Sequence, residues 1–212
     1  MIITLSGYTK TGKDTAANHL QRMHGFTPIA FADALYKEIS SSFGVDVDFL
    51  KDREVKNNPN KALAIQLSDN IEYIQLMEEL GYDLKAPRTS REILQTWGTE
   101  YRRGQDDSYW IKRTKEFIML SDHDDFVVTD ARFENEVRAM VELGSVMIRL
   151  EKDGCGPIND HSSEWVLPIE QADYVIYNNR TIDELCIQLD GLVVYERVIE
   201  NVYCEIIENV SH

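Results

Sequence analysis

Two glycines and a lysine near the start of the chain have the spacing of a phosphate-binding loop. Gly7, Gly12 and Lys13 fit the pattern G-x-x-x-x-G-K, but Asp14 stands where that pattern has Ser or Thr, and Thr15 follows it. A short apolar strand before the loop and a helix after it are the surroundings that the motif requires. The backbone N–H groups of such a turn bind anions, and the Lys13 ammonium would reach the β and γ phosphates of a nucleotide. An ordinary strand-to-helix turn that favours glycine is the alternative interpretation.

Carboxylates at two places could serve a magnesium ion. Asp14 could hold Mg²⁺ through water, Thr15 could bind it instead, or Asp14 could simply be a favourable acidic residue in the first helical turn. Asp130 follows the apolar segment 126–129, and ligands of open α/β sheets bind beyond the carboxyl ends of the strands. We therefore expect Asp130 to face the phosphate loop. The alternative is that Asp130 caps a helix starting near Arg132.

Arginines supply the positive charge that a second phosphate group would need. Each one taken singly is more readily explained as a solvated surface residue. Two phosphate groups that meet at one centre need several fixed positive charges, however, and the guanidinium fork suits phosphate oxygens. The set consists of Arg88, Arg91, Arg102, Arg103 and Arg132. Asp33 follows the second predicted strand, where capping of a helix and contact with a substrate are equally good explanations.

No combination of nucleophile, histidine and acid is visible in the sequence. The histidines have no metal-ligand spacing; they are His19, His24, His123, His161 and His212. This pattern agrees with phosphoryl transfer to a phosphate acceptor, because that acceptor is already an anionic nucleophile and catalysis then depends on positioning and charge neutralisation. The three cysteines form no CxxC pair, so we interpret them as reduced thiols of a cytosolic protein.

Strands and helices are expected to alternate along most of the chain. Short apolar runs predict strands at 2–5, 28–31, 126–129, 146–150 and 174–177. Helical spacing of apolar residues predicts helices at 13–23, from 33 through 43, 61–80, from 90 through 97, 107–120, 134–143 and 182–210, the last one interrupted at Gly191 if at all. This order indicates an α/β fold with a parallel sheet and helices on both faces.

Composition and charge limit the function further. The 212 residues suffice for one domain, and no apolar run approaches the ~18 residues of a transmembrane helix. With 22 basic and 37 acidic residues the net charge is −15, which argues against binding to nucleic acid or to an anionic membrane. The start of the chain lacks the basic flank of a signal peptide, so we expect a cytoplasmic protein.

Several blocks follow one another in a specific order along the chain: Leu5-Ser6-Gly7 and 11–15, 31–33, 91–102, 128–136, 160–164 and 178–185. In these blocks and their order the chain resembles the phage deoxynucleoside monophosphate kinases over nearly its whole length. In this family the Gly-Lys-Asp variant of the phosphate loop is typical. The resemblance implies a five-stranded parallel P-loop kinase core in a single domain, 1–212. It also implies a helical nucleotide-binding insertion at about 45–105 and a lid at about 152–164.

The same resemblance implies a transfer of phosphate from ATP to a deoxynucleoside monophosphate, with Mg²⁺, and assigns roles to matching residues. The ATP phosphates would be held by Gly7, Thr9, Lys10, Thr11, Gly12, Lys13, Asp14 and Thr15. Asn178 and Thr181 would lie near the adenine, with a plain turn as the alternative. The acceptor site would be lined by Asp33, Arg91, Gln95 and Trp97. The acceptor phosphate or the metal would be met by Arg102, Asp130 and Arg132.

Other functions remain open at the level of sequence. Dephospho-CoA kinases and phosphomevalonate kinases use related cores, so a different phosphorylated acceptor is an alternative. A non-enzymatic nucleotide-binding regulator would carry the same loop but would not release ADP in response to an acceptor. The long C-terminal helix could pack on its own core or on a second copy, which makes a homodimer a further expectation.

Overall fold

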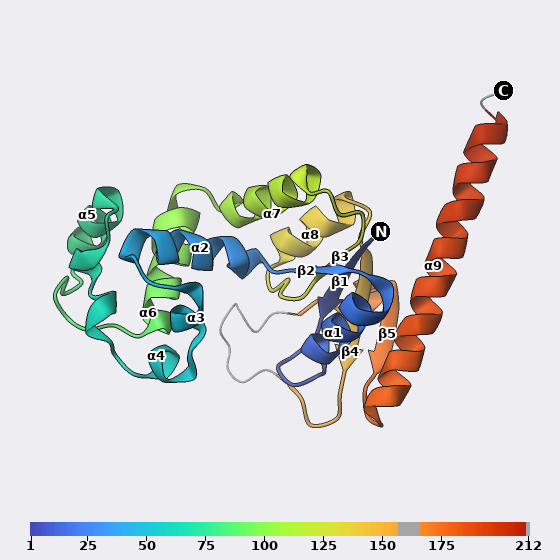
Figure 1. Ribbon diagram of the computed structural model, residues 1–212, viewed down its shortest axis with the longest axis horizontal. Coiled ribbons are helices and arrows are strands. Elements are labelled where there is room, and N and C mark those ends of the chain that lie inside the picture. The colour runs from blue at the N-terminus through green and yellow to red at the C-terminus, as the bar shows by residue number, and fades with distance from the viewer. Residues whose placement is uncertain (157–165, 211–212) are drawn as a thin grey trace. The chain divides into compact units, whose positions relative to one another are not determined.

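The computed structural model describes residues 1–156 and 166–210, and these fall into two compact units (Figure 1). Unit 1 consists of Met1–Ala30 and Leu120–His212, and unit 2 consists of Phe31–Met119. Each unit has a hydrophobic core of its own. The two are therefore described separately.

Unit 1 contains the sheet. Its strands are β1 (Ile2–Ser6), β2 (Thr27–Ile29), β3 (Phe126–Val128), β4 (Val146–Glu151) and β5 (Tyr174–Tyr177). Its helices are α1 (Lys13–His24), α8 (Glu134–Glu142), the 3₁₀ turn η5 (Ile169–Gln171) and α9 (Ile182–Val210). All strand pairs are parallel, and the order across the sheet is β2-β3-β1-β4-β5. The predicted α/β class with five parallel strands is confirmed.

The strand order determines where a ligand can bind. The chain leaves β1 towards β2 on one side of the sheet, and it leaves β4 towards β5 on the other side. Ligands of open parallel sheets bind outside the carboxyl ends of the strands at such a switch point. The neighbours of β1 are β3 and β4, with Thr4 level with Val128 and Ser6 level with Arg149. The loops that follow β1, β3 and β4 therefore meet at one edge.

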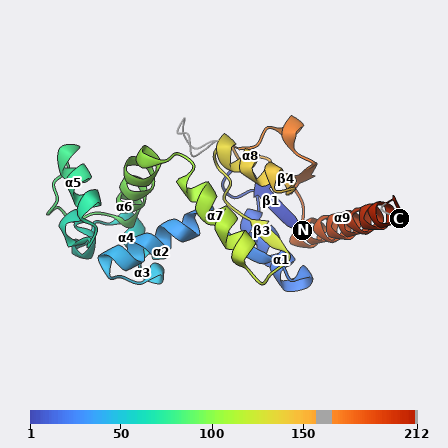
Figure 2. The same cartoon turned by 90° about the horizontal axis from the view of Figure 1, so that it is seen from above.

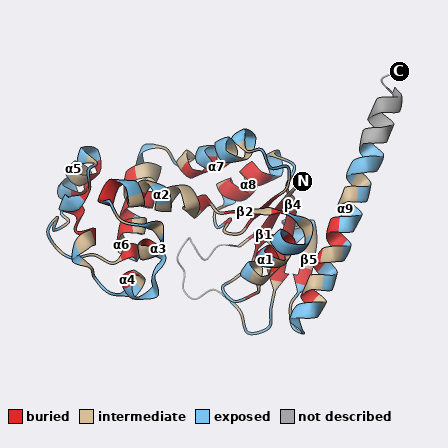
Figure 3. Ribbon diagram, viewed as in Figure 1, coloured by how far each residue is buried: buried red, intermediate tan, exposed pale blue. Residues whose placement is uncertain are grey.

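Helices α1 and α9 cover one face of this sheet. Their buried residues pack against the strands: Ala16, Ala17 and Leu20 come from α1, and Leu185, Leu189, Leu192 and Val193 come from α9. Strand residues Ile3 and Leu5 point to this face, whereas Thr4 points to the other. The three central strands β1, β3 and β4 are mostly buried (Figure 3), and α8 lies across the sheet from α1 (Figure 2). Helix α9 runs without a break through Gly191.

Unit 2 is helical. It contains α2 (Phe31–Phe43), α3 (Val47–Lys51), α4 (Arg53–Asn57), η1 (Lys61–Leu63), η2 (Ile65–Leu67), α5 (Ile71–Glu79), α6 (Ser90–Gln95), η3 (Thr96–Arg103) and nearly all of α7 (Tyr109–Leu120). Its core is rich in aromatic rings, with Phe43, Tyr73, Trp97 and Tyr101 in mutual contact. The predicted helical character of this stretch is confirmed.

One predicted helix of unit 2 is wrong in its length. The segment 61–80 is not one helix, because Leu63 and Ile65 are both fully buried although they are only two positions apart. Two short 3₁₀ turns make this possible. Helix α5 then begins only after Asn70, whose side chain accepts a hydrogen bond from the N–H of Tyr73.

Two predicted helix starts also differ from the structure. Helix α2 begins at Phe31, so Asp33 lies within its first turn and does not precede the helix. The interpretation of Asp130 as a helix cap is wrong, because α8 begins at Glu134. The Glu136 side chain accepts hydrogen bonds from the backbone N–H groups of Arg132 and Phe133 at 2.9 and 3.2 Å, and it satisfies the start of that helix.

Within the part of the chain that the structure describes, no helix is both long and apolar enough to cross a membrane. Cys155 and Cys186 carry free thiols.

A carboxylate network holds the N-terminus of the chain to α9. The Asp125 carboxylate accepts hydrogen bonds from the Met1 ammonium at 2.9 Å and from Arg197 at 2.7 Å. Burial alone would raise the pKa of Asp125, but the hydrogen bonds from the N-terminal ammonium and Arg197 outweigh burial and lower that pKa. A carboxyl whose pKa is depressed on folding stabilises the protein above its unfolded pKa and loses this effect as the pH falls through the folded pKa.

Replacing Asp125 by Asn should therefore lower the free energy of unfolding at pH 7 by about 1–2 kcal/mol. The difference from the wild type should shrink below about pH 4, where the wild-type carboxyl becomes protonated. Urea denaturation at pH 7 and at a pH below 4, followed by circular dichroism, measures the free energy of unfolding of both proteins. Asp122→Asn, at an exposed neighbouring position, is the control. An equal loss of stability at both pH values would contradict the assignment.

Candidate functional site

The loop between β1 and α1 has a backbone that requires glycine at two positions. Gly7 has φ +154° and Gly12 has φ +107°. A Cβ at Gly7 would lie 2.5 Å from the Leu150 carbonyl oxygen, and one at Gly12 would lie 2.4 Å from the Asn178 amide nitrogen. Side chains at these positions would therefore both strain the backbone and collide with neighbours. An ordinary strand-to-helix turn does not need both features.

The loop closes around the ammonium group of Lys13. This group donates hydrogen bonds to the carbonyl oxygens of Gly7 at 2.6 Å and Tyr8 at 2.8 Å. Helix α1 begins at Lys13 with Gly12 as its N-cap, a residue that has no side chain to cap the first turn. The first N–H groups of a helix have no partner within the helix, and they carry the positive end of its dipole. Lys13 and these N–H groups thus form a site for anionic oxygens.

Three cations gather at this loop. Burial lowers the pKa of Lys13, and the positive charges of Arg132 and Arg149 lower it further, while Asp14 acts in the opposite direction. Like charges at close range repel one another, and an anion bound among them removes that penalty. The electrostatics of the loop therefore favour a multiply charged anion.

Arg149 was not predicted as a site residue. It lies near the end of β4, its residue is only 4% exposed, and its guanidinium carbon is 5.0 Å from the centre of the Tyr8 ring. It donates to Glu151 at 2.5 Å and to the Leu167 carbonyl at 3.1 Å. The signal in the sequence was a charged residue within an apolar strand, which is rare without a partner or a function.

The carboxylates proposed for metal binding occupy the same edge of unit 1. Asp14 is exposed in the first turn of α1, and Thr15 is half-buried beside it. Asp130 is half-buried two residues after β3, the strand that pairs with β1. Two acidic oxygen donors and a hydroxyl are the ligand types that Mg²⁺ prefers. Which of them serves a metal stays a prediction.

Asn178 and Thr181 line a pocket between the end of β5 and the start of α9. The pocket has a volume of about 390 Å³, within the range of small-molecule sites, and its wall includes Tyr177, Leu185 and Gln188. The Asn178 amide also donates to the Thr11 carbonyl at 2.9 Å, which joins this pocket to the loop between β1 and α1. The Thr181 hydroxyl accepts from the N–H of Glu184 at 3.2 Å, so it has a capping role as well.

In unit 2, one carboxylate binds three donors. Glu38 of α2 accepts hydrogen bonds from the Trp97 indole at 2.9 Å, from Arg102 Nε at 2.8 Å and from the Tyr109 hydroxyl. Sequence reasoning missed Glu38, because nothing distinguishes it from other acidic residues of an amphipathic helix. Its effect is to fix the position of Arg102.

Arg102 is held among aromatic rings as well as by Glu38. Its guanidinium carbon lies 4.6 Å from the centre of the Tyr101 ring and 4.8 Å from that of Tyr109. Burial alone would lower the pKa of Arg102, but the hydrogen bond and the charge of Glu38 outweigh burial and raise it. Among the residues that the structure describes, its ion pair with Glu38 is made through Nε. The terminal nitrogens are the part of the fork that can meet a phosphate.

The segment η3, which carries Arg102, is a π-helix. It begins at Thr96, whose hydroxyl donates to the Glu92 carbonyl at 3.0 Å inside the preceding turn. Bonds of this kind compete with the regular helix ladder, and π-helical turns are frequent at functional sites. The wider turn allows Trp97, Tyr101 and Arg102 to gather around one carboxylate.

The other predicted acceptor residues are spread over unit 2. Arg91 and Gln95 are both exposed and lie four positions apart on α6, so they share one face of that helix. Asp33 forms an ion pair of 3.7 Å with Lys51. Trp97 is only 1% exposed and packs in the core, so it acts on the site through Glu38 and Arg102.

The predicted lid falls mostly outside the described residues. Of the range 152–164, the structure describes residues up to 156, where the Asp153 N–H donates to the Asn179 side chain at 2.8 Å.

Comparison with known proteins gives a consistent result. A sequence model of the family described as "Deoxynucleotide monophosphate kinase" matches residues 50–189. The deoxynucleotide monophosphate kinase of Escherichia phage RB69 is 26% identical over 249 residues, covering 91% of this chain and 99% of the phage protein. That of Enterobacteria phage T4 is 22% identical over 230 residues, with coverages of 87% and 95%. A protein of Acanthamoeba polyphaga mimivirus, provisionally given the same name, is 28% identical over 206 residues, with coverages of 91% and 96%.

The contact between Asn178 and the loop predicts an effect on anion binding. Asn178→Ala removes the hydrogen bond to the Thr11 carbonyl, so the loop should lose part of its rigidity and bind inorganic tripolyphosphate about tenfold more weakly. Isothermal titration calorimetry measures the affinity. Asn18→Ala, at an exposed position of α1, is the control. Unchanged affinity in a folded Asn178→Ala protein would show that the loop needs no such support.

Proposed function

This chain belongs to the deoxynucleotide monophosphate kinase family, and from that membership we propose that it transfers the γ-phosphate of ATP to a deoxynucleoside monophosphate. The products are ADP and a deoxynucleoside diphosphate. The observation that carries the donor side is the Lys13 ammonium held by the loop carbonyls at the N-terminus of α1. Lysine and helix N–H groups at this place suit the β and γ phosphates of ATP.

The donor nucleotide takes its phosphates at the loop and its base in the neighbouring pocket. The phosphate ligands are Gly7, Thr9, Lys10, Thr11, Gly12, Lys13, Asp14 and Thr15. The two glycines support this role, because their surroundings leave no room for a Cβ and let the backbone approach a ligand closely. The adenine then lies against Asn178 and Thr181, in the pocket of about 390 Å³.

Magnesium fits the residues at this edge of the sheet. Asp14, in the first turn of α1, and Asp130, on the loop that follows β3, are oxygen donors, and Thr15 offers a hydroxyl next to Asp14. Bound Mg²⁺ neutralises charge that develops on the phosphate oxygens. Asp130, no longer explained as a helix cap, is the stronger candidate of the two carboxylates.

We assign the binding of the acceptor nucleotide to unit 2. Arg102, fixed by Glu38 and by two aromatic rings, presents its terminal nitrogens to the acceptor phosphate. Arg91 and Gln95 share an exposed face that suits the nucleoside, and Asp33 adds a polar contact. Trp97 keeps the Glu38–Arg102 pair in place from the core.

The chemical step requires little covalent catalysis by the protein. An oxygen of the acceptor phosphate is already an anionic nucleophile, so no side chain has to remove a proton from it. Lys13 and Arg132 of unit 1 neutralise the phosphates of the donor, and Arg102 of unit 2 neutralises the phosphate of the acceptor. Arg149 supports the same loop from the end of β4. Positioning and charge neutralisation then supply most of the rate enhancement.

The setting of the enzyme is part of the proposal. We place it in the cytoplasm, the host's if a phage encodes it, acting on small nucleotides and not on nucleic acid, which its charge of −15 would repel. Val194, Val198 and Val202 are apolar side chains that α9 leaves exposed, and they support a homodimer.

A panel of acceptors tests the proposal. Purified protein with ATP and Mg²⁺ should release ADP when at least one of the common deoxynucleoside monophosphates is added, and a coupled assay for ADP measures the rate. Dephospho-CoA and phosphomevalonate should give no release. If no nucleotide stimulates turnover, or if another acceptor does so, the proposed activity is wrong.

A matched pair of arginine variants separates the acceptor site from general charge. Arg102→Gln should raise KM for the nucleotide acceptor at least about tenfold, because a charge-assisted contact to phosphate is lost. Arg113→Gln removes an exposed arginine of α7 that pairs with its neighbour Glu116, and it should behave as the wild type. Equal effects of both substitutions would refute the role of Arg102.

A further inference from the structure

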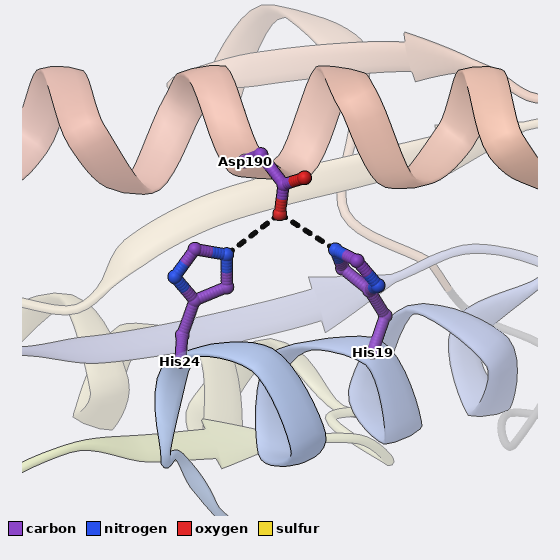
Figure 4. A group of neighbouring side chains, drawn as sticks. All are labelled: His19, His24 and Asp190. Atoms are coloured by element: carbon purple, nitrogen blue, oxygen red, sulfur yellow. Dashed lines mark hydrogen bonds and ion pairs between the residues drawn. The ribbon is translucent and has the colours of Figure 1, made fainter.

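Two histidines of α1 and one aspartate of α9 converge on a single point (Figure 4). His19 Nε2 and His24 Nε2 lie 2.6 and 2.7 Å from the same oxygen, Asp190 Oδ1. Their rings stand edge to face with centroids 5.9 Å apart. The proposed kinase reaction uses none of the three residues.

The three donor atoms lie close enough together for one metal ion to bind them after small movements. They all lie within 4.8 Å of one another. Four-coordinate zinc holds its ligands at about 2.0–2.1 Å, which separates ligand atoms by roughly 3.3 Å. Each nitrogen therefore has to move away from Asp190 Oδ1 by only about 0.6 Å. Small changes of side-chain torsion achieve this.

Exposure of the cluster leaves room for an ion and its remaining ligands. The side chains of His19 and His24 are 14% and 15% exposed, whereas that of Asp190 is 45% exposed. The imidazoles are thus held in place by their surroundings, and the carboxylate is open to solvent. Water can complete the coordination from this side, as it does where proteins supply three ligands.

The charge at this point favours a divalent cation. Asp190 Oδ1 lies within hydrogen-bond distance of both imidazoles, and its carboxylate is the negatively charged donor among the three. Cys186 lies four positions before Asp190 on α9 and is not among the residues whose ligand atoms converge. The donor set is therefore two imidazoles and one carboxylate, without a thiolate.

We propose that His19, His24 and Asp190 form a zinc site that joins α1 to α9. Two imidazole nitrogens and a carboxylate oxygen are ligands of Zn²⁺ and of other late first-row metals, whereas Mg²⁺ prefers oxygen alone. A neutral imidazole that binds through Nε2 carries its proton on Nδ1, so the N–H bonds to Asp190 are exchanged for metal bonds. Sequence spacing hides the site because Asp190 lies far along the chain.

The zinc site and the phosphate loop occupy opposite ends of α1. Lys13 is the first residue of this helix and His24 is the last, so the 12-residue helix places roughly 18 Å between the ends. Zinc here acts as a clamp between the helix that begins at the phosphate loop and the helix that lines the adjoining pocket. Binding to the folded state alone stabilises that state.

Direct metal binding tests the proposal. The full chain, without an affinity tag, is freed of metal with a chelator and titrated with Zn²⁺ in the absence of nucleotide. Calorimetry should give a stoichiometry of one zinc ion per chain, and the Tm should rise with zinc concentration. Asp190→Asn and His19→Gln should each weaken binding at least about tenfold. His123→Gln, at an exposed position away from the cluster, should leave zinc binding unchanged.

Two results would overturn the zinc site. One is the absence of zinc binding to the wild type, and the other is binding that survives both substitutions in folded protein. If either variant fails to fold, Co²⁺ added to the wild type decides: the visible absorption of a four-coordinate site with nitrogen ligands supports the proposal, and a spectrum like that of aqueous Co²⁺ refutes it. Mg²⁺ should displace neither ion.

Discussion

The fold of unit 1 serves one electrostatic constraint, the placing of a half-buried ammonium group at the start of a helix. Lys13 bonds to the carbonyl oxygens of Gly7 and Tyr8, and burial together with Arg132 and Arg149 lowers its pKa. Such a concentration of positive charge is unfavourable by itself and becomes favourable when phosphate is bound. The parallel sheet supplies the edge at which these groups meet, since β1 lies between β3 and β4.

Unit 2 holds its cation, Arg102, in a different way. Glu38 fixes Arg102 with a hydrogen bond, and the Tyr101 and Tyr109 rings limit where the guanidinium can go. A carboxylate beside the arginine reduces its net charge, but it also defines the direction of the remaining donors. In this way a strongly acidic chain holds a small number of oriented cations, to which the proposed function assigns a nucleotide.

Much of this could be predicted from the sequence, because the relevant signals are local. The glycine spacing, the apolar strands and the helical periodicities predicted the parallel fold and the glycine loop between β1 and α1. The helix predicted at 61–80 failed since burial of both Leu63 and Ile65 depends on contacts that periodicity does not contain. Glu38, Arg149 and the His19–His24–Asp190 cluster were missed for the same reason: their partners come from other segments of the chain.

The most direct test concerns the ammonium group itself. Lys13→Met keeps most of the length of the side chain and removes its charge, while Arg22→Ala removes an exposed cation from the same helix. We expect Lys13→Met to leave the Tm nearly unchanged and to lower acceptor-dependent ADP release by at least about 100-fold. Arg22→Ala should have no effect on turnover. A folded Lys13→Met protein with wild-type turnover would contradict the central claim.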